Sequence, residues 1–267
     1  MIRRMAFGML LAAALCPPVA AQDLRKGAAA YNRGDYEAAL KEWRPLAALG
    51  NAQALFNLGV MHEKGQGVPR DPAEAVKWYR KAAERGQVQA QYLLGNSYES
   101  GDGVPQDYAL ALKWYRLAAQ QGHPGAQNSV GAMHESGQIG QVNYDEAVKW
   151  YRMAAEQGMA EAQDSLGGMY EKGQGVRQNY ATAVMWYRRA AEQGYPRAQY
   201  DLGFMYANGR GVPRDPILAY MWFSLAATKG NASAVWGRDH MARRMTAAEV
   251  GRAQRLAREW WAKRQRR

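Results

Sequence analysis

The apolar and small residues of this chain recur with helical spacing, in pairs of stretches separated by short glycine-containing segments. In residues 50–85 these stretches contain Ala54, Leu55, Leu58, Gly59 and His62, and then Ala75, Trp78, Tyr79, Ala82 and Ala83. Within each set the spacing places the side chains on one face of an α-helix. The pattern therefore predicts two amphipathic helices joined by a loop.

This pair of stretches returns with a fixed period. Tryptophans followed by Tyr or Phe lie 36 residues apart, at Trp78, Trp114, Trp150, Trp186 and Trp222. A period of this length is typical of a stacked array. Glycines in register divide residues 50–229 into five units, 50–85, 86–121, 122–157, 158–193 and 194–229. The predicted fold class is all-α, an α-solenoid of antiparallel helix pairs.

The loop inside each unit has its own pattern. In the first unit it consists of Gly65, Gly67, Val68 and Asp71. Glycine permits the left-handed conformation that ends a helix, and Asp or Asn caps the next one. We expect the valine to tuck the loop under the stack. In the third unit Gly137 and Gly140 are spaced differently and the valine is displaced, which indicates either a slightly different loop or an irregularity where a partner docks.

Two positions that recur in every unit, one glycine and one tryptophan, indicate how the helices pack. Glycine recurs inside the first helix of each unit, at Gly59, Gly95, Gly131, Gly167 and Gly203. Because helical glycine costs about 1 kcal/mol relative to alanine, this column predicts close approach of two helix backbones. The repeated tryptophans are expected in the core, so Trp150→Ala is predicted to cost about 3–5 kcal/mol.

The combined columns, Ala-x3-Leu-Gly-x-Met-Tyr, Gly-x-Gly-Val and Asp-x3-Ala-x2-Trp-Tyr-x2-Ala-Ala, resemble the Sel-1-like repeat family of the tetratricopeptide-repeat superfamily. The resemblance implies a right-handed α-solenoid and an adaptor or scaffold role, in bacteria often in the cell envelope. Residues 22–49 look like a degenerate N-terminal repeat, and residues 230–267 like a half-repeat with a basic capping helix. Cysteine-rich members linked to β-lactam-related activity carry a cysteine pair per repeat, which this chain lacks.

Residues 1–21 have the three parts of a secretory signal peptide. Arg3 and Arg4 precede an apolar run over residues 6–15, and small residues follow at 19–21. The run is too short to span a bilayer comfortably. We expect cleavage before Gln22 and export to the periplasm, with secretion from the cell, or retention as an N-terminal anchor, as alternatives. The single cysteine, Cys16, lies in this signal.

Positive charge is concentrated at the C-terminus. The chain has a net charge of +11, and residues 238–267 contain ten basic and three acidic residues. Such an end attracts anionic lipid, cell-wall glycan or acidic proteins, and Trp260 and Trp261 beside it add a membrane-surface interpretation. The alternative is a solvated cap that keeps the array soluble. Nucleic acid is a poor candidate for an exported chain.

Catalytic motifs are not found in the sequence. It contains neither Ser-x-x-Lys nor Gly-x-Ser-x-Gly. His62-Glu63 and His134-Glu135 lack the second histidine of a His-Glu-x-x-His zinc site, and these histidines occupy a column that holds tyrosine in other units. We interpret them as tyrosine substitutes at a packed position. The sequence predicts no enzyme, no cofactor and no metal site.

With the register that the resemblance implies, the inner face of each first helix forms a concave binding wall. The residues predicted to contact a partner there are Phe56, Glu63, Tyr92, Glu99, Glu135, Glu171, Tyr200 and Phe204. Aromatic residues serve as anchors and carboxylates provide selectivity. The alternatives are that the glutamates brace helix ends or face water. A catalytic carboxylate dyad is disfavoured, because a repeated column singles out no pair.

The function expected from these features is a non-enzymatic protein–protein interaction scaffold of the bacterial envelope that binds a protein or peptide in its concave face. Two alternatives stay open. One is a protein that binds or hydrolyses muropeptide or β-lactam, and the other is a secreted effector that engages a host protein. The sequence names neither the partner nor the oligomeric state.

Overall fold

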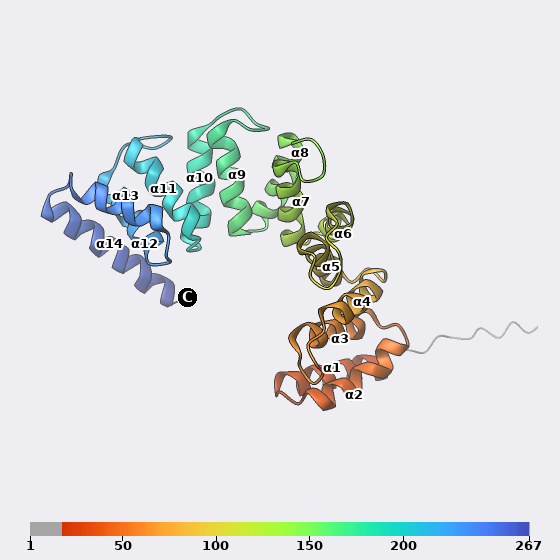
Figure 1. Ribbon diagram of the computed structural model, residues 1–267. Coiled ribbons are helices and arrows are strands. Elements are labelled where there is room, and N and C mark those ends of the chain that lie inside the picture. The colour runs from red at the N-terminus through yellow and green to blue at the C-terminus, as the bar shows by residue number, and fades with distance from the viewer. Residues whose placement is uncertain (1–17, 267) are drawn as a thin grey trace, which may run out of the picture. The chain divides into compact units, whose positions relative to one another are not determined.

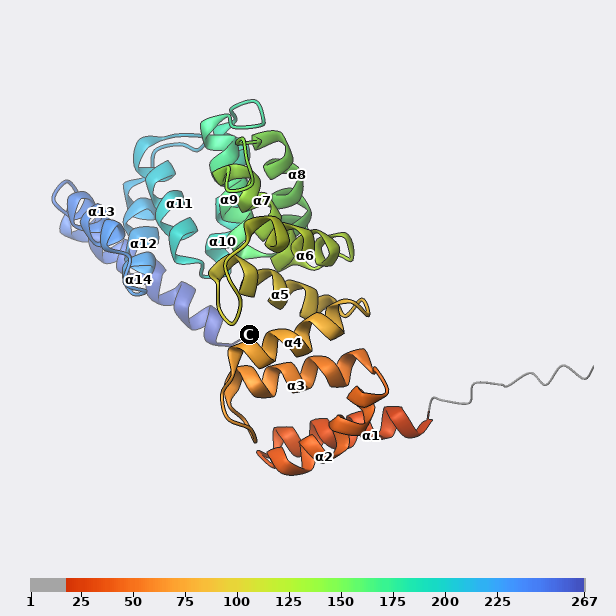
Figure 2. The same ribbon diagram turned by 45° about the vertical axis from the view of Figure 1, so that its right-hand side comes forward.

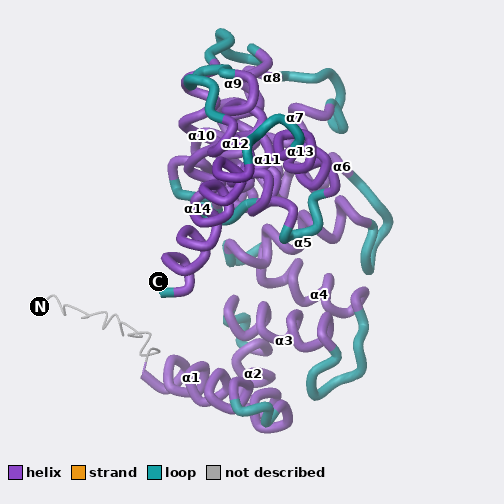
Figure 3. The backbone as a smooth tube through the Cα atoms, turned by 90° about the vertical axis from the view of Figure 1, so that its left-hand side faces the viewer, coloured by secondary structure: helices purple, strands orange, loops and turns teal. Residues whose placement is uncertain are grey.

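The computed structural model describes residues 18–266. These residues form helices and connecting loops without a strand (Figures 1 and 3). In order, the helices are α1 Pro18–Asn32, α2 Tyr36–Ala48, α3 Ala52–Lys64, α4 Pro72–Ala83, α5 Val88–Ser100, α6 Tyr108–Gln120, α7 Pro124–Ser136, α8 Tyr144–Glu156, α9 Ala160–Lys172, α10 Tyr180–Glu192, α11 Pro196–Asn208, α12 Pro216–Ala227, α13 Ala232–Ala242 and α14 Ala247–Gln265. The predicted all-α fold of helix pairs is confirmed.

The described chain divides into two compact units. Residues 18–90 and 102–105 form the first unit, and residues 91–101 and 106–266 form the second. The first contains α1 to α4, and the second contains most of α5 and all of α6 to α14. The apolar part of the predicted signal peptide lies outside the described residues, and its predicted cleavage site falls in the first turn of α1.

Each repeat is a pair of helices whose ends the sequence specifies. The α3–α4, α7–α8 and α9–α10 pairs each pack side by side (Figure 2). Asp71 Oδ1 accepts a hydrogen bond of 3.0 Å from the Glu74 amide at the start of α4, and Gly65 ends α3 with φ 68°. Equivalent caps begin α6, α8, α10 and α12. The predicted helix caps are therefore confirmed.

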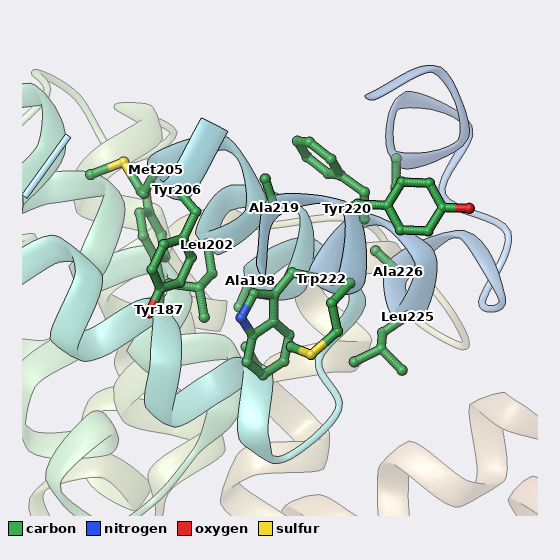
Figure 4. Packing of buried hydrophobic residues seen from close by; sticks show 14 of the residues in the cluster. Tyr187, Ala198, Leu202, Met205, Tyr206, Ala219, Tyr220, Trp222, Leu225 and Ala226 are labelled. Atoms are coloured by element: carbon green, nitrogen blue, oxygen red, sulfur yellow. The ribbon is translucent and has the colours of Figure 1, made fainter. Parts of the chain in front are cut away.

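Alanine, leucine, methionine and tyrosine side chains fill the space between the helices of a repeat. In the fifth repeat, Ala198 and Leu202 of α11 belong to one buried cluster with Trp222 and Leu225 of α12, in which the indole of Trp222 lies next to Ala198 (Figure 4). Val212, from the loop of this repeat, packs against the same cluster, and Val176 packs against the cluster built on α8 and α9. The expectation that the loop valine tucks inward is confirmed in these two repeats.

The glycine column faces an aromatic side chain of the second helix, and only at Gly203 is a backbone atom of that helix, the Ala219 carbonyl oxygen, also among the nearest atoms to an added Cβ, at 3.3 Å. A Cβ placed on Gly131 of α7 would lie 2.8 Å from Cδ1 of the Tyr151 ring of α8. The same relation links Gly167 to Tyr187 and Gly203 to Phe223. Glycine recurs here because an aromatic ring from the second helix lies flat against the first.

The tryptophan column is buried less uniformly than predicted. Trp186 and Trp222 are buried, but Trp78 and Trp150 are only partly buried. Successive helical residues point about 100° apart. Since Tyr151 is directed at α7 and is 2 % exposed, the neighbouring Trp150 lies at the margin of the interface. Trp150 is therefore not the fully buried residue that was predicted, and we expect Trp150→Ala to cost less than truncation of Tyr151, whose side chain is buried.

Buried glutamines join successive repeats, a feature that the sequence pattern did not predict. Gln127 Nε2 donates to the Ala119 carbonyl of the preceding repeat at 3.1 Å, and Gln127 Oε1 accepts from Gln157 Nε2 at 2.7 Å. Gln163 makes the same two bonds, to the Ala155 carbonyl and from Gln193. Because an unpaired buried amide is costly, these bonds favour one register between repeats.

The C-terminal helix packs against the repeat before it. Trp260 lies edge-on to Trp222 of α12, with ring centroids 6.2 Å apart, and Arg264 Nη1 donates to the Glu192 carbonyl at the end of α10 at 3.1 Å. Trp260 and Trp261 are thus engaged within the fold, which removes the support they gave to a membrane-surface interpretation. Among the described helices, none is long and apolar enough to cross a membrane.

Candidate functional site

The residues predicted to bind a partner lie on α3, α5, α7, α9 and α11, the first helices of the five repeats. We call the surface that these helices form within each unit the first-helix face. All eight predicted side chains are half-buried: Phe56, Glu63, Tyr92, Glu99, Glu135, Glu171, Tyr200 and Phe204. Each therefore has one part packed in the repeat and another part accessible. Partner binding by these residues stays a prediction.

The four glutamates brace the helix pair in which they lie. In every case the hydroxyl of the buried tyrosine on the second helix donates to Oε2 of the glutamate. The bonds are Tyr79–Glu63 at 2.6 Å, Tyr115–Glu99 at 2.6 Å, Tyr151–Glu135 at 2.7 Å and Tyr187–Glu171 at 2.8 Å. Burial and the neighbouring carboxylate raise the pKa of each tyrosine far above its ordinary value. The glutamates therefore brace the helices of each repeat, which was one of the alternatives that the sequence left open.

The brace leads to a test that separates hydrogen bonding from charge. We expect Glu135→Ala to lower the free energy of unfolding by about 1–3 kcal/mol, because it leaves the Tyr151 hydroxyl without its acceptor. Glu135→Gln keeps an acceptor oxygen and should cost clearly less. Urea unfolding of the two variants measures this difference. Equal losses would mean that the tyrosine hydrogen bond is not what holds Glu135.

Arginines of the second helices bind the first helix of the next repeat. Each guanidinium contacts the side chain at the position that holds tyrosine in most repeats and histidine in the others. The pairs are Arg116–His134 at 3.2 Å, Arg152–Tyr170 at 2.9 Å and Arg188–Tyr206 at 2.7 Å. His134 therefore fills the tyrosine role, as predicted. Two other histidines also have contacts: His123 Nδ1 accepts a hydrogen bond from the Ala126 amide and caps α7, and the ring of His240 stacks on Trp236.

His134 makes the stability of the fold depend on pH. Burial, and then the positive charge of Arg116, lower the pKa of His134 below its ordinary 6.5. As the pH falls, the unfolded chain takes up this proton before the folded chain does, so the contribution of His134 to stability decreases below about pH 6.5. His134→Tyr should remove that part of the pH dependence. Thermal unfolding of both proteins between pH 5 and 8 gives the difference, in which other titrating groups cancel. Parallel curves would contradict the assignment.

Two aspartates and an arginine form a cluster between α9 and α11 of the second unit. Asp164 is 2 % exposed, and its Oδ2 lies 3.2 Å from Arg197 Nε, which also approaches Asp201 at 4.0 Å. Burial, and then the carboxylate of Asp201, raise the pKa of Asp164 above its ordinary value. Arg197 therefore offsets part of the negative charge of these two carboxylates.

Each unit has a groove on its first-helix face that some of the predicted aromatic residues line. The N-terminal groove, of about 510 Å³, is lined by Phe56 and Val60 of α3 together with Tyr31 and Trp43. The C-terminal groove, of about 490 Å³, lies on α11, α12 and α13. Its lining residues are Tyr200, Phe204, Ala207, Asn208, Arg214, Phe223, Trp236, Gly237, His240, Met241 and Arg244.

The structure does not gather all predicted residues into one site. Tyr92 stacks on His123, with ring centroids 4.5 Å apart, and lines neither groove. Trp236 and Arg244, which sequence reasoning missed, line the C-terminal groove. They lie after the last full unit, where no repeat column marks them. Among the described residues, no group of three or more His, Cys, Asp or Glu could hold a metal ion.

The irregular loop of the third repeat is more open than its equivalents. A Cβ added to Gly140 would have no neighbouring atom within 4 Å, and Val142 is 47 % exposed. In the next repeat, a Cβ on Gly175 would overlap the backbone of Tyr144. The third loop thus lacks the close contact to the preceding repeat, and nothing in its geometry indicates a bound partner.

Comparison with known proteins places these features in a family. The Sel1 repeat model matches residues 52–87, 88–123, 124–159, 160–195 and 196–231. A Sel1 repeat protein from Oxalobacter formigenes is 38 % identical, with a TM-score of 0.75, over 79 % of this chain and 84 % of its own. A protective antigen of uropathogenic Escherichia coli with an SLR fold is 27 % identical, with a TM-score of 0.45, over 92 % of this chain and 71 % of its own.

Among curated proteins, none matches the sequence significantly. The matched units cover most of the chain, and their register begins two residues after the glycines that divide the sequence. Sel1 repeats adopt a tetratricopeptide-like solenoid fold and generally mediate protein–protein interactions. The chain belongs to the Sel1 repeat family.

Proposed function

We propose that this protein is a non-enzymatic adaptor, exported to the cell envelope, that binds a partner protein or peptide on the first-helix face of its repeats. The observation that carries the proposal is the groove in each unit, lined by half-buried aromatic side chains. Exposed aromatic side chains in concave sites are the usual anchors of protein interfaces. The general role of Sel1 repeats in protein–protein interaction supports this assignment.

The internal bonds of the repeats favour binding without rearrangement. Tyr151 is tied to Glu135 and Gln157 to Gln127, so both helices of the third repeat are fixed relative to each other. A surface that is already ordered loses little conformational entropy when a partner binds. These bonds therefore support repeats that are ordered before binding, rather than repeats that fold around the partner.

Export is the part of the proposal that rests on sequence alone. If residues 1–21 act as a signal peptide, the mature N-terminus is Gln22 and the protein is found in the periplasmic fraction. N-terminal sequencing of the protein from fractionated cells measures both properties. An intact N-terminus on protein from the cytoplasmic fraction would contradict export.

Partner binding is tested by crosslinked affinity capture from the producing cell, with the whole protein as bait. Matched baits carry Phe56→Ala with Tyr200→Ala in the grooves, or Met153→Ala with Met185→Ala on exposed positions of second helices. We expect one protein that the native and methionine-variant baits capture and the groove variant loses at least ten-fold. Thermal unfolding checks that all baits are folded. Equal capture by all three baits would place binding elsewhere.

A further inference from the structure

The fifth repeat differs from the other four in two columns that contact each other. Where the earlier repeats have a tyrosine that donates to a glutamate, this repeat has Phe223 and Ala207. Both partners of the brace are therefore absent together. Loss of only one partner would leave a polar group unpaired, whereas the joint exchange gives an apolar surface between α11 and α12.

This apolar surface is the floor of the C-terminal groove. The ring of Phe223 lies against two glycines. A Cβ added to Gly203 would lie 2.9 Å from the ring, and a Cβ added to Gly237 would lie 3.1 Å from it. The ring is 3 % exposed, so it closes the bottom of the groove and the glycines let both helices pack against it. Tyr200 contacts Phe223 with ring centroids 5.6 Å apart. The floor and one wall are thus aromatic and held in place by packing.

The opposite wall has an aromatic side chain that the fold does not use. Trp236 of α13 is 70 % exposed, and its only ring contact in the described structure is with His240, at 5.0 Å between centroids and 14° between planes. An exposed tryptophan beside an apolar floor is a typical interface anchor, because its large ring gains the most from losing contact with water.

The rim of the groove is positively charged. Arg214 and Arg244 both line it, and its lining contains no Asp or Glu. Arg214 Nε donates to the Ala207 carbonyl at 3.2 Å, a bond that fixes the guanidinium without neutralising its charge. The groove therefore combines a fixed aromatic interior with uncompensated cationic groups, which complements an acidic ligand with an apolar side chain.

We propose that the C-terminal groove binds a short acidic peptide segment of the partner, with one large apolar side chain between Tyr200 and Trp236, and carboxylates paired with Arg214 and Arg244. The volume of about 490 Å³ accommodates a side chain with its flanking backbone. This inference rests on the proposed adaptor function and adds the chemistry of the recognised segment.

The test uses fluorescently labelled ten-residue peptides and the purified protein. One peptide set has a central leucine or tryptophan between aspartates and glutamates, a second replaces every acid by lysine, and a third replaces the central residue by alanine. We expect anisotropy to show binding of the first set, at least ten-fold weaker binding of the other two, and weakening with added salt. Failure of the acidic set to bind, or equal binding of all sets, overturns the inference.

Variants locate the binding. Trp236→Ala and Arg244→Glu should each weaken binding of the acidic peptides at least ten-fold, and Arg244→Glu should bind the lysine set better than the native protein does. The matched controls, Met153→Ala and Arg252→Glu, lie at exposed positions outside the groove and should stay within two-fold. Acidic-peptide binding that is unaffected by the groove variants also overturns the inference. Affinity capture that succeeds while the acidic peptides fail leaves the adaptor function intact and removes only this assignment.

Discussion

Replacing Tyr151 by alanine is expected to lower the free energy of unfolding by about 3–5 kcal/mol, the usual range for truncation of a buried aromatic side chain. The ring is 2 % exposed, lies against Gly131 and donates its hydroxyl to Glu135 at 2.7 Å. Because Gly131 supplies no side chain on the facing helix, that helix offers no group that could fill the cavity from this side. Urea unfolding followed by circular dichroism measures the loss.

Two matched variants separate the components of this effect. Tyr151→Phe keeps the ring and removes only the hydroxyl, and the fifth repeat already holds Phe223 in this column. We expect it to cost about 1 kcal/mol. Trp150→Ala removes a larger ring that is only partly buried and should cost less than Tyr151→Ala. If Trp150→Ala proves more damaging, the assignment of Tyr151 as the central packing residue is wrong.

The second large effect is expected at Gly175, in the loop of the fourth repeat. This residue has φ 65°, and a Cβ there would overlap the backbone of Tyr144 at the start of α8. Gly175→Ala therefore combines left-handed strain of about 1–2 kcal/mol with overpacking of about 1–3 kcal/mol. We expect a total loss of about 2–5 kcal/mol, measured by urea unfolding.

Gly158 provides the control for this experiment. It has φ 92° and no neighbouring atom within 4 Å of an added Cβ. Gly158→Ala should therefore show the strain alone, about 1–2 kcal/mol. If the two substitutions lower the free energy of unfolding by similar amounts, the loop of the fourth repeat moves to accommodate the added methyl group. Its contact with the third repeat then contributes little to stability.

The repeat pattern predicted the helix pairs, their caps and the inward-facing loop valines, because local chemistry decides these features. Asp71 caps α4 and Gly65 ends α3 through interactions that span only a few residues. The role of His134 could also be read from its column, since tyrosine occupies the equivalent positions.

Features that depend on contacts between helices were predicted less well. The repeat pattern could not distinguish the buried Tyr151 from the half-buried Trp150, because both residues recur every 36 residues and both belong to the predicted apolar face of the second helix. The glutamate column indicated a surface, but its hydrogen bonds to tyrosine appear only once both helices are in place. The exchange to Phe223 and Ala207 was visible in the sequence, but its meaning required knowing that these two columns meet. Trp236 lies after the last full repeat, where no column could identify it.

The central claim, that a partner binds on the first-helix face, is tested most directly by photo-crosslinking in the producing cell. A photoreactive amino acid is placed at Lys64 or Asn208, which line the two grooves, or at Lys113 or Lys149, which are exposed on second helices. If the partner binds in the grooves, a discrete protein adduct forms from at least one groove position and none forms from the second-helix positions. An adduct only from Lys113 or Lys149, or no adduct from either groove, would contradict the claim.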